Sequence, residues 1–152
     1  MNPLGLTLVG CCAEKLQRIA PARQLYRSAL FQKAAAYAGN LGHDWMVISA
    51  AYGLIGADSQ MAPYDVTMAG LTPEQRLAWA HHVAQQLEAL AIFHDAERVE
   101  VTLLAGESYA GWVPLVSSWC TVVQPMRGMQ IGQRLQWLNA QQLQPALFVE
   151  AA

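Results

Sequence analysis

Two carboxylates and four tyrosines are the side chains of this chain best suited to chemistry. The acids are Asp65 and Glu107, and each is expected in a loop that follows a strand. A carboxylate near the anomeric carbon of a sugar can activate water or stabilise an oxocarbenium-like transition state. Tyrosine rings offer stacking faces to a nucleobase, and those near the acids are Tyr26, Tyr52, Tyr64 and Tyr109. This combination is compatible with cleavage of an N-glycosidic bond, and also with binding of a nucleotide without reaction.

Basic side chains are concentrated near the start of the chain. Residues 14–33 contain five cations and one acid, a net charge of +4, although the formal net charge of all 152 residues is −2. A basic edge on such a protein favours an anionic ligand such as a phosphate chain. We expect phosphate contacts from Lys15, Arg23, Arg27 and Arg127, while charge alone is equally compatible with solvated side chains. An amine near the C1′ atom of a sugar can also form a Schiff base, but phosphate contact is the role we favour for Lys15.

Apolar segments typical of strands alternate with helical patterns along the chain. Strands are expected at residues 6–9, 46–50, 99–105 and 121–123, and helices at residues 28–38, 72–90, 109–117 and 131–140. The clearest helix start combines a capping Thr72, a first-turn Pro73 and a capping-box Gln75. The alternation predicts an α/β fold, with a single three-layer domain over residues 1–152 and a mainly parallel central sheet.

Ligands of parallel α/β sheets bind outside the carboxyl ends of the strands, which here selects residues 11–28, 51–65, 106–109 and 124–133. Residues 51–65 show neither a helical nor a strand period, and irregular loops of this length are often functional. We therefore expect this loop to form one wall of a ligand pocket. The side chains expected to bind substrate are Cys11, Lys15, Tyr26, Ser28, Ser49, Tyr52, Gly53, Pro63, Tyr64, Tyr109 and Gln130, with Ser49 and Gln130 reading polar edges of a base.

Several classes of protein are disfavoured by the sequence. The glycine-rich motifs of dinucleotide-binding proteins and P-loop NTPases are absent from it. The three cysteines include no CxxC pair, and the four histidines lack the spacing of metal ligands, so we expect neither a metal site nor a cofactor. No apolar run approaches the roughly 20 residues that cross a bilayer, and we expect a cytoplasmic protein. The high hydrophobic fraction of 54% suggests that a subunit or a ligand covers part of the surface.

Six blocks of the sequence resemble, in the same order, a family of small bacterial and phage domains long described as of unknown function. The blocks are VGCCAEK at residues 9–15, PARQLYRS at 21–28, ISAAYGL at 48–54, APYD at 62–65, AGESY at 105–109 and MQIGQ at 129–133. That family is similar to the YaaA peroxide-stress proteins and, more distantly, to the uracil-DNA-glycosylase-like domain of archaeosine synthase. Brig-type anti-phage proteins belong to the same neighbourhood and are DNA glycosylases that excise glucosylated hydroxymethylcytosine from phage DNA.

The resemblance implies a uracil-DNA-glycosylase-like fold and a DNA partner. Our leading hypothesis is a monofunctional DNA glycosylase acting on a modified base, with Asp65 as the preferred catalytic carboxylate and Glu107 as the second choice. The Gly-Gln-Asp-Pro-Tyr and His-Pro-Ser motifs of ordinary uracil-DNA glycosylases are absent, so their catalytic residue cannot be transferred to this sequence. The main alternative is a nucleotide or nucleic-acid binding module without catalysis, and another is an obligate subunit of a larger assembly.

Overall fold

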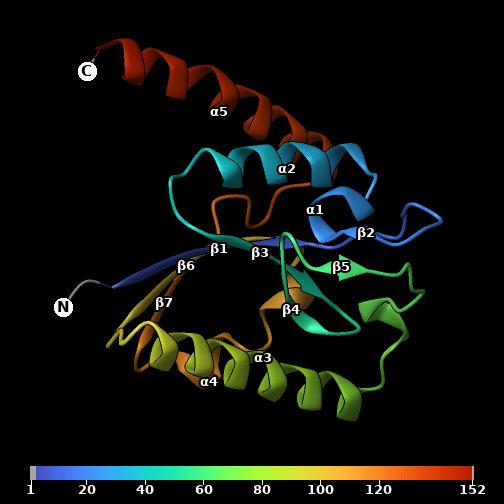
Figure 1. Ribbon diagram of the computed structural model, residues 1–152. Helices are drawn as coiled ribbons and strands as arrows, with labels where there is room; N and C mark the ends of the chain where they lie inside the picture. Colours follow the sequence, from blue (N-terminus) through green and yellow to red (C-terminus); the bar gives the residue numbers. More distant parts are fainter. Residues whose placement is uncertain (1–2, 152) are drawn as a thin grey trace.

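A central sheet is covered on both faces by helices, as the computed structural model shows for the backbone of residues 3–151 and the side chains of residues 3–142. Helices α1 (Ala22–Leu25), α2 (Ala29–Gly39) and α5 (Ile131–Ala151) lie over one face, and α3 (Pro73–Phe93) and α4 (Val113–Val116) lie over the other (Figure 1). This is the three-layer α/β architecture that the alternating pattern predicts.

The sheet has five strands in the order β4-β3-β1-β6-β7. Strands β1 (Leu4–Gly10), β3 (Trp45–Ser49), β6 (Val99–Leu104) and β7 (Cys120–Val123) are parallel, whereas β4 (Gly53–Gly56) runs antiparallel to β3 at the edge. The chain adds β3 on one side of β1 and β6 on the other, so the strand order reverses at β1. In open α/β sheets such a reversal opens a crevice at the carboxyl ends of the strands.

The alternation of side chains along β1 divides the interior into two hydrophobic cores. Leu6 and Leu8 pack towards α3, together with Val83 and Leu87. Val9 packs towards α2 and α5, in the cluster that also contains Phe31, Ala34 and Leu138. Successive strand side chains point to opposite faces, so a strand that is apolar at nearly every position must be covered on both sides.

Two helices begin where their capping signals predict. The Ser28 hydroxyl accepts a hydrogen bond from the Phe31 N–H at 3.1 Å at the start of α2. Thr72 and Gln75 form a complete capping box at the start of α3, with hydrogen bonds of 3.1 and 2.8 Å. Each cap satisfies N–H groups that have no partner within the helix.

Three expectations about local structure are wrong. Residues 51–65 are not wholly irregular, because they contain β4 and the short strand β5 (Gln60–Met61), which pairs with β2 (Ala20–Pro21). The helix expected at residues 109–117 is interrupted at Gly111 and consists of the 3-10 turn η2 (Glu107–Ala110) followed by α4. Helix α5 continues well beyond residue 140. A further 3-10 turn, η1 (Met68–Gly70), precedes α3.

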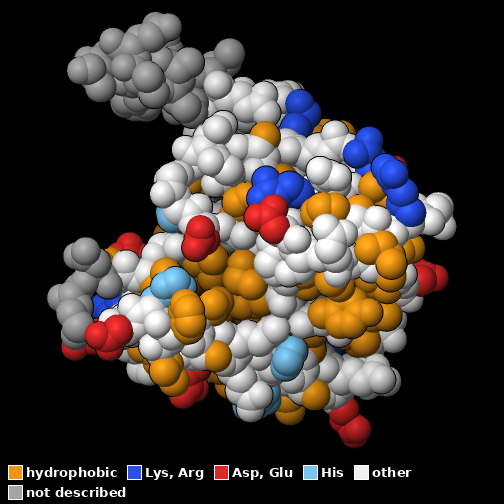
Figure 2. Space-filling model, viewed as in Figure 1, with side chains coloured by type: hydrophobic (Ala, Val, Ile, Leu, Met, Phe, Trp, Pro, Cys, Tyr) orange, Lys and Arg blue, Asp and Glu red, His pale blue; other side chains and the backbone are white. Residues whose placement is uncertain are grey.

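Apolar side chains remain exposed on the face drawn in Figure 2, which is the face of β4 and the adjoining side of α3. A hollow of about 400 Å³ on this side is lined by Met46, Leu54, Leu90 and Phe93, and Phe93 is 82% exposed. In the described part of the chain, none of the helices combines the length and the apolar character needed to span a membrane.

Candidate functional site

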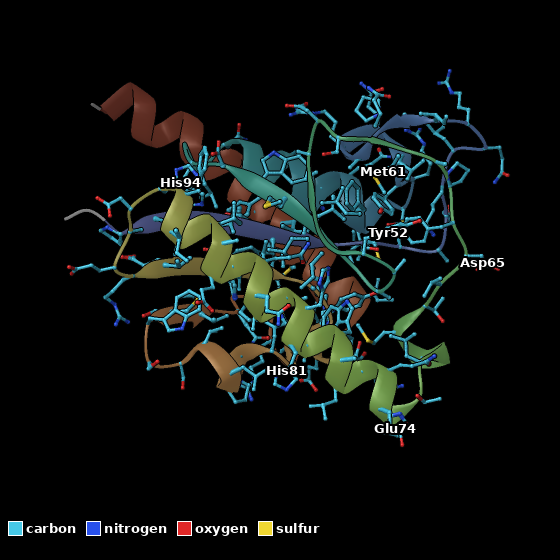
Figure 3. The ribbon with its side chains drawn as sticks, turned by 60° about the horizontal axis from the view of Figure 1, so that its bottom comes forward. Tyr52, Met61, Asp65, Glu74, His81 and His94 are labelled. Atoms are coloured by element: carbon cyan, nitrogen blue, oxygen red, sulfur yellow. The ribbon has the colours of Figure 1, made fainter. Side chains whose placement is uncertain are left out.

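The candidate site lies where β1, β3 and β6 end side by side. Gly10, the last residue of β1, pairs with Ile48 near the end of β3, and Val9 pairs with Leu104, the last residue of β6. The loops that follow these strands therefore meet at one end of the sheet. Figure 3 shows Tyr52, Met61 and Asp65 at this end of the molecule and His94 at the opposite end.

Three hydroxyl groups form a hydrogen-bonded chain beneath these loops. The Tyr64 hydroxyl lies 2.7 Å from the Ser49 hydroxyl and is also hydrogen-bonded to the Tyr26 hydroxyl. Ser49 Oγ accepts the N–H groups of Ala51 and Tyr52 at 3.1 and 3.4 Å, so its own proton is available to Tyr64. Tyr26 and Ser49 are fully buried. We expected Ser49 to read a base edge, but the structure places it where it holds Tyr64.

Burial raises the pKa values of three phenols at this site, so these groups stay protonated well above neutral pH. Loss of solvation on burial raises the pKa of Tyr64 and of Tyr109 far above the usual tyrosine value, and the nearby Cys11 thiol raises both further. Burial likewise raises the pKa of Tyr26. These side chains therefore face the site as neutral groups that can donate and accept hydrogen bonds.

Cys11 and Tyr109 connect the ends of β1 and β6. The Cys11 Sγ atom lies 3.3 Å from the Tyr109 hydroxyl, although the two residues are 98 positions apart. The Tyr109 ring packs edge-on against Trp79 at a centroid distance of 5.8 Å, and Trp79 Nε1 donates a hydrogen bond to the Ser49 carbonyl at 2.8 Å. These contacts link Cys11, Tyr109, Trp79 and Ser49 into one continuous group.

An open groove of about 410 Å³ brings together Lys15, Pro63, Tyr64 and Asp65. The Lys15 ammonium lies 4.6 Å from the centre of the Tyr64 ring and donates a hydrogen bond to the Ala13 carbonyl at 3.3 Å. Asp65 is exposed. The groove therefore places an amine, a carboxylate and an aromatic ring within one solvent-accessible space.

A smaller and more enclosed cavity, of about 130 Å³, lies between the ends of β1 and β6. Its polar lining includes Cys11, Ser28, Tyr109 and Arg134. Arg134 was not among the predicted site residues. Its Nε atom donates to the Met129 carbonyl at 3.0 Å, and its guanidinium lies close to Gly106. The sequence does offer a signal for Arg134, because this cation directly follows the strand-end segment at residues 124–133 and lies one helical turn after the predicted Gln130. In the structure its N–H donates to the Gln130 carbonyl at 2.9 Å.

Tyr52 and Gly53 form the rim of the site above α3. Tyr52 is 47% exposed, and its ring packs edge-on against Tyr64 at 5.2 Å. Gly53 has a φ of +71°, and a Cβ atom there would collide with the Gln86 side chain. Gly53 is therefore needed both for the turn after β3 and for the close approach of Gln86.

Three predicted site residues lie at the margin of this arrangement. Glu107 is exposed at the start of η2 and lines neither the groove nor the enclosed cavity. Arg127 is exposed in the turn after β7, and Gln130 is exposed immediately before α5. The structure thus groups Asp65, but not Glu107, with Lys15 and Tyr64.

The predicted phosphate ligands Arg23 and Arg27 lie in different surroundings. Arg23 forms an ion pair with Asp58 at 2.8 Å, lies 5.8 Å from the Trp45 ring centre, and lines a separate cavity of about 500 Å³ that also includes His94. Arg27 is exposed and immediately precedes Ser28, which lines the enclosed cavity. Among the side chains that the structure describes, no cluster of three or more His, Cys, Asp or Glu residues is arranged to hold a metal ion.

Comparison with known proteins gives a family but no activity. No curated protein and no solved structure matches the chain significantly. The model of a family of unknown function, DUF6884, matches residues 6–140, which is most of the 152-residue chain. The chain therefore belongs to the DUF6884 family.

Proposed function

We propose that this protein is a DNA glycosylase that excises a modified base and leaves an abasic site. The observation that carries the proposal is that the groove lined by Lys15, Tyr64 and Asp65 and the cavity lined by Cys11, Tyr109 and Arg134 both lie at the strand ends. Base excision needs a recess for the extruded base and a carboxylate near the sugar. Glucosylated hydroxymethylcytosine of phage DNA is the first candidate substrate, and the role would then be anti-phage defence.

The size of the enclosed cavity supports a role in holding a base. Its volume of about 130 Å³ is close to that of a cavity of about 150 Å³ that accommodates benzene in another protein, so it suits one six-membered ring. The neutral hydroxyl of Tyr109, the Cys11 thiol and the Arg134 guanidinium supply polar contacts around such a ring. In this proposal the sugar lies towards the wider groove, whose volume is about 410 Å³.

Within this proposal the side chains have separate roles. Asp65 stabilises the developing positive charge on the sugar or activates the attacking water. Tyr52, the most exposed ring of the site, stacks on a nucleobase beside the extruded one. Arg27 contacts phosphates, and the hydroxyl chain from Ser49 through Tyr64 to Tyr26 keeps the groove in shape.

The experiment that tests the proposal uses synthetic duplex and single-stranded DNA containing cytosine, hydroxymethylcytosine or its glucosylated form. Incubation followed by alkaline cleavage should reveal abasic sites in the glucosylated substrate and none in unmodified DNA. Asp65→Asn provides the matched variant. Absence of abasic sites from every modified or damaged oligonucleotide would refute the glycosylase proposal.

A binding module without catalysis is the second candidate, and the burial pattern favours it in one respect. The polar groups buried at the strand ends are neutral hydroxyls, whereas Asp65 and Glu107 are both exposed. Neutral donors and acceptors suit recognition of a base or a sugar. In this case the oligonucleotides of the same experiment would bind and remain uncleaved, and Asp65→Asn and Glu107→Gln would change only the affinity.

A further inference from the structure

The chain contains two lysines, and the structure gives them different surroundings. Lys33 lies on α2, where its ammonium donates a hydrogen bond to the Asn139 side chain of α5 at 2.6 Å. Lys15 lies in the groove, at the end of the sheet where the candidate site is found. Its ammonium contacts the Ala13 carbonyl and the ring of Tyr64, and no carboxylate of the described residues forms an ion pair with it.

Both the backbone and the side chain of Lys15 are held in place. Its backbone forms an antiparallel bridge with Tyr26, which is fully buried. Its ammonium lies 4.6 Å from the centre of the Tyr64 ring and 5.8 Å from the centre of the Tyr26 ring. The Tyr64 hydroxyl is itself fixed by Ser49 and Tyr26. Two rings therefore fix the position of the amine in the groove that Asp65 also lines.

We propose that Lys15 forms an imine with the C1′ aldehyde of an abasic deoxyribose in DNA. This inference rests on the proposed function, because the aldehyde is the product that base excision would leave in the groove. An amine positioned beside a sugar carbonyl is a recognised nucleophile. A lysine that only contacted phosphate would not need to share a groove with a carboxylate, whose charge repels phosphate.

The reaction balances without an oxidant or a metal. The ammonium first releases one proton to water, and the lone pair of the resulting amine attacks C1′. The aldehyde oxygen takes a proton that the nitrogen loses and becomes the hydroxyl of a carbinolamine. Loss of water then gives the C=N bond, with the oxygen of that water coming from the aldehyde and both hydrogens from the amine. Asp65 is the carboxylate in the groove that can take a proton from the nitrogen and return it to the departing hydroxyl.

The test uses duplex DNA in which an abasic site has been made beforehand from uracil with a separate glycosylase. Borohydride reduces an imine to a stable amine, so a covalent complex of protein and DNA survives on a denaturing gel. We expect this complex with the unmodified protein and with Lys33→Arg, and a loss of at least about tenfold with Lys15→Arg, which keeps the charge but removes the nucleophilic amine. Peptide mapping should place the adduct on Lys15.

Three results would overturn the inference: no complex with the unmodified protein, a complex that persists in Lys15→Arg, or an adduct mapped to another amine. Lys15→Arg should still bind the abasic duplex, which is checked by fluorescence anisotropy. Because the abasic site is made beforehand, the test is independent of base excision. Base excision without a trapped complex would refute the imine alone, whereas a trapped complex without base excision would refute only the proposed glycosylase.

Discussion

The hydroxyl groups of Ser49 and Tyr64 lie 2.7 Å apart and tie the end of β3 to the loop that follows β5. Tyr64 extends the connection to Tyr26, which lies 38 residues earlier in the chain. The Lys15 ammonium lies over the Tyr64 ring, and the Tyr52 ring packs against the same ring in an edge-to-face arrangement. A hydrogen bond between the buried Ser49 and the partly buried Tyr64 thus positions the functional groups of the groove.

Tyr64→Phe should destabilise the protein, because it removes two hydrogen bonds and leaves the buried hydroxyls of Ser49 and Tyr26 without their partner. We expect a decrease of about 1–3 kcal/mol in the free energy of unfolding, measured by urea denaturation. Tyr52→Phe is the matched control, and its effect should stay within about 0.5 kcal/mol because Tyr52 is half exposed. Equal effects of the two substitutions would contradict a structural role for the hydroxyl chain.

Stability should decrease at alkaline pH. Burial raises the pKa of Cys120 from 9.0 to about 11, and burial also raises the pKa values of Tyr26, Tyr64 and Tyr109. The folded protein retains these protons at pH values where the unfolded chain releases them. Stabilisation is therefore complete below the unfolded pKa values and decreases above about pH 9, by up to about 1.4 kcal/mol per pH unit for each group.

Urea denaturation across this pH range measures the decrease, and tyrosinate absorbance provides an independent measurement. Tyr26, Tyr64 and Tyr109 should ionise together with unfolding, not before it. Gradual ionisation of all tyrosines in a still-folded protein would show that these phenols are accessible to solvent.

Gln86→Ala should expose the edge of the sheet. The Gln86 side chain accepts the Leu54 N–H at 2.8 Å and donates to the Leu54 carbonyl at 3.2 Å, so it satisfies both backbone polar groups of this residue of edge strand β4. We expect a loss of about 1–2 kcal/mol of stability and increased self-association, measured by denaturation and light scattering. Gln85→Ala, on an exposed side of α3, should show neither effect.

Features that depend on neighbouring residues were predicted correctly from the sequence. The start of α3 was predicted correctly because Thr72, Pro73 and Gln75 determine it locally. The fold class followed from strands that are apolar on both faces, and the strand-end rule then brought Cys11, Ser49 and Tyr109 to one end of the sheet. These inferences need only local pattern and general topology.

Interactions between distant residues could not be predicted in the same way. Strand β4 has only Leu54 and Ile55 between two glycines, and its edge is completed by Gln86, 32 residues away from Leu54. Arg23 lies close in sequence to Lys15 and Arg27, yet its guanidinium is paired with Asp58 in a separate cavity and does not line the groove. Arg134 was left out of the predicted site for a similar reason, since only the packing of α5 places it over Gly106.

The two candidate carboxylates should differ in their effect on base excision. Asp65 lines the groove with Lys15 and Tyr64, whereas Glu107 lies outside it. Asp65→Asn should lower the single-turnover rate of abasic-site formation by at least about 100-fold, and Glu107→Gln by less than about threefold. Both side chains are exposed, so neither substitution should alter the free energy of unfolding appreciably. A larger loss with Glu107→Gln would transfer the catalytic role to the end of β6.

Arg27 and Arg23 should differ in their contribution to DNA binding. Arg27 is exposed beside Ser28 at the enclosed cavity, whereas Arg23 is paired with Asp58 beside a separate cavity. Each phosphate contact to duplex DNA contributes about 0.9 to the slope of log affinity against log salt concentration. Arg27→Ala should therefore reduce this slope by about 0.9, and Arg23→Ala should leave it unchanged. Anisotropy titrations at several salt concentrations measure both slopes, and a reduced slope for Arg23→Ala alone would place the phosphate contacts on the side of β4 and β5 instead.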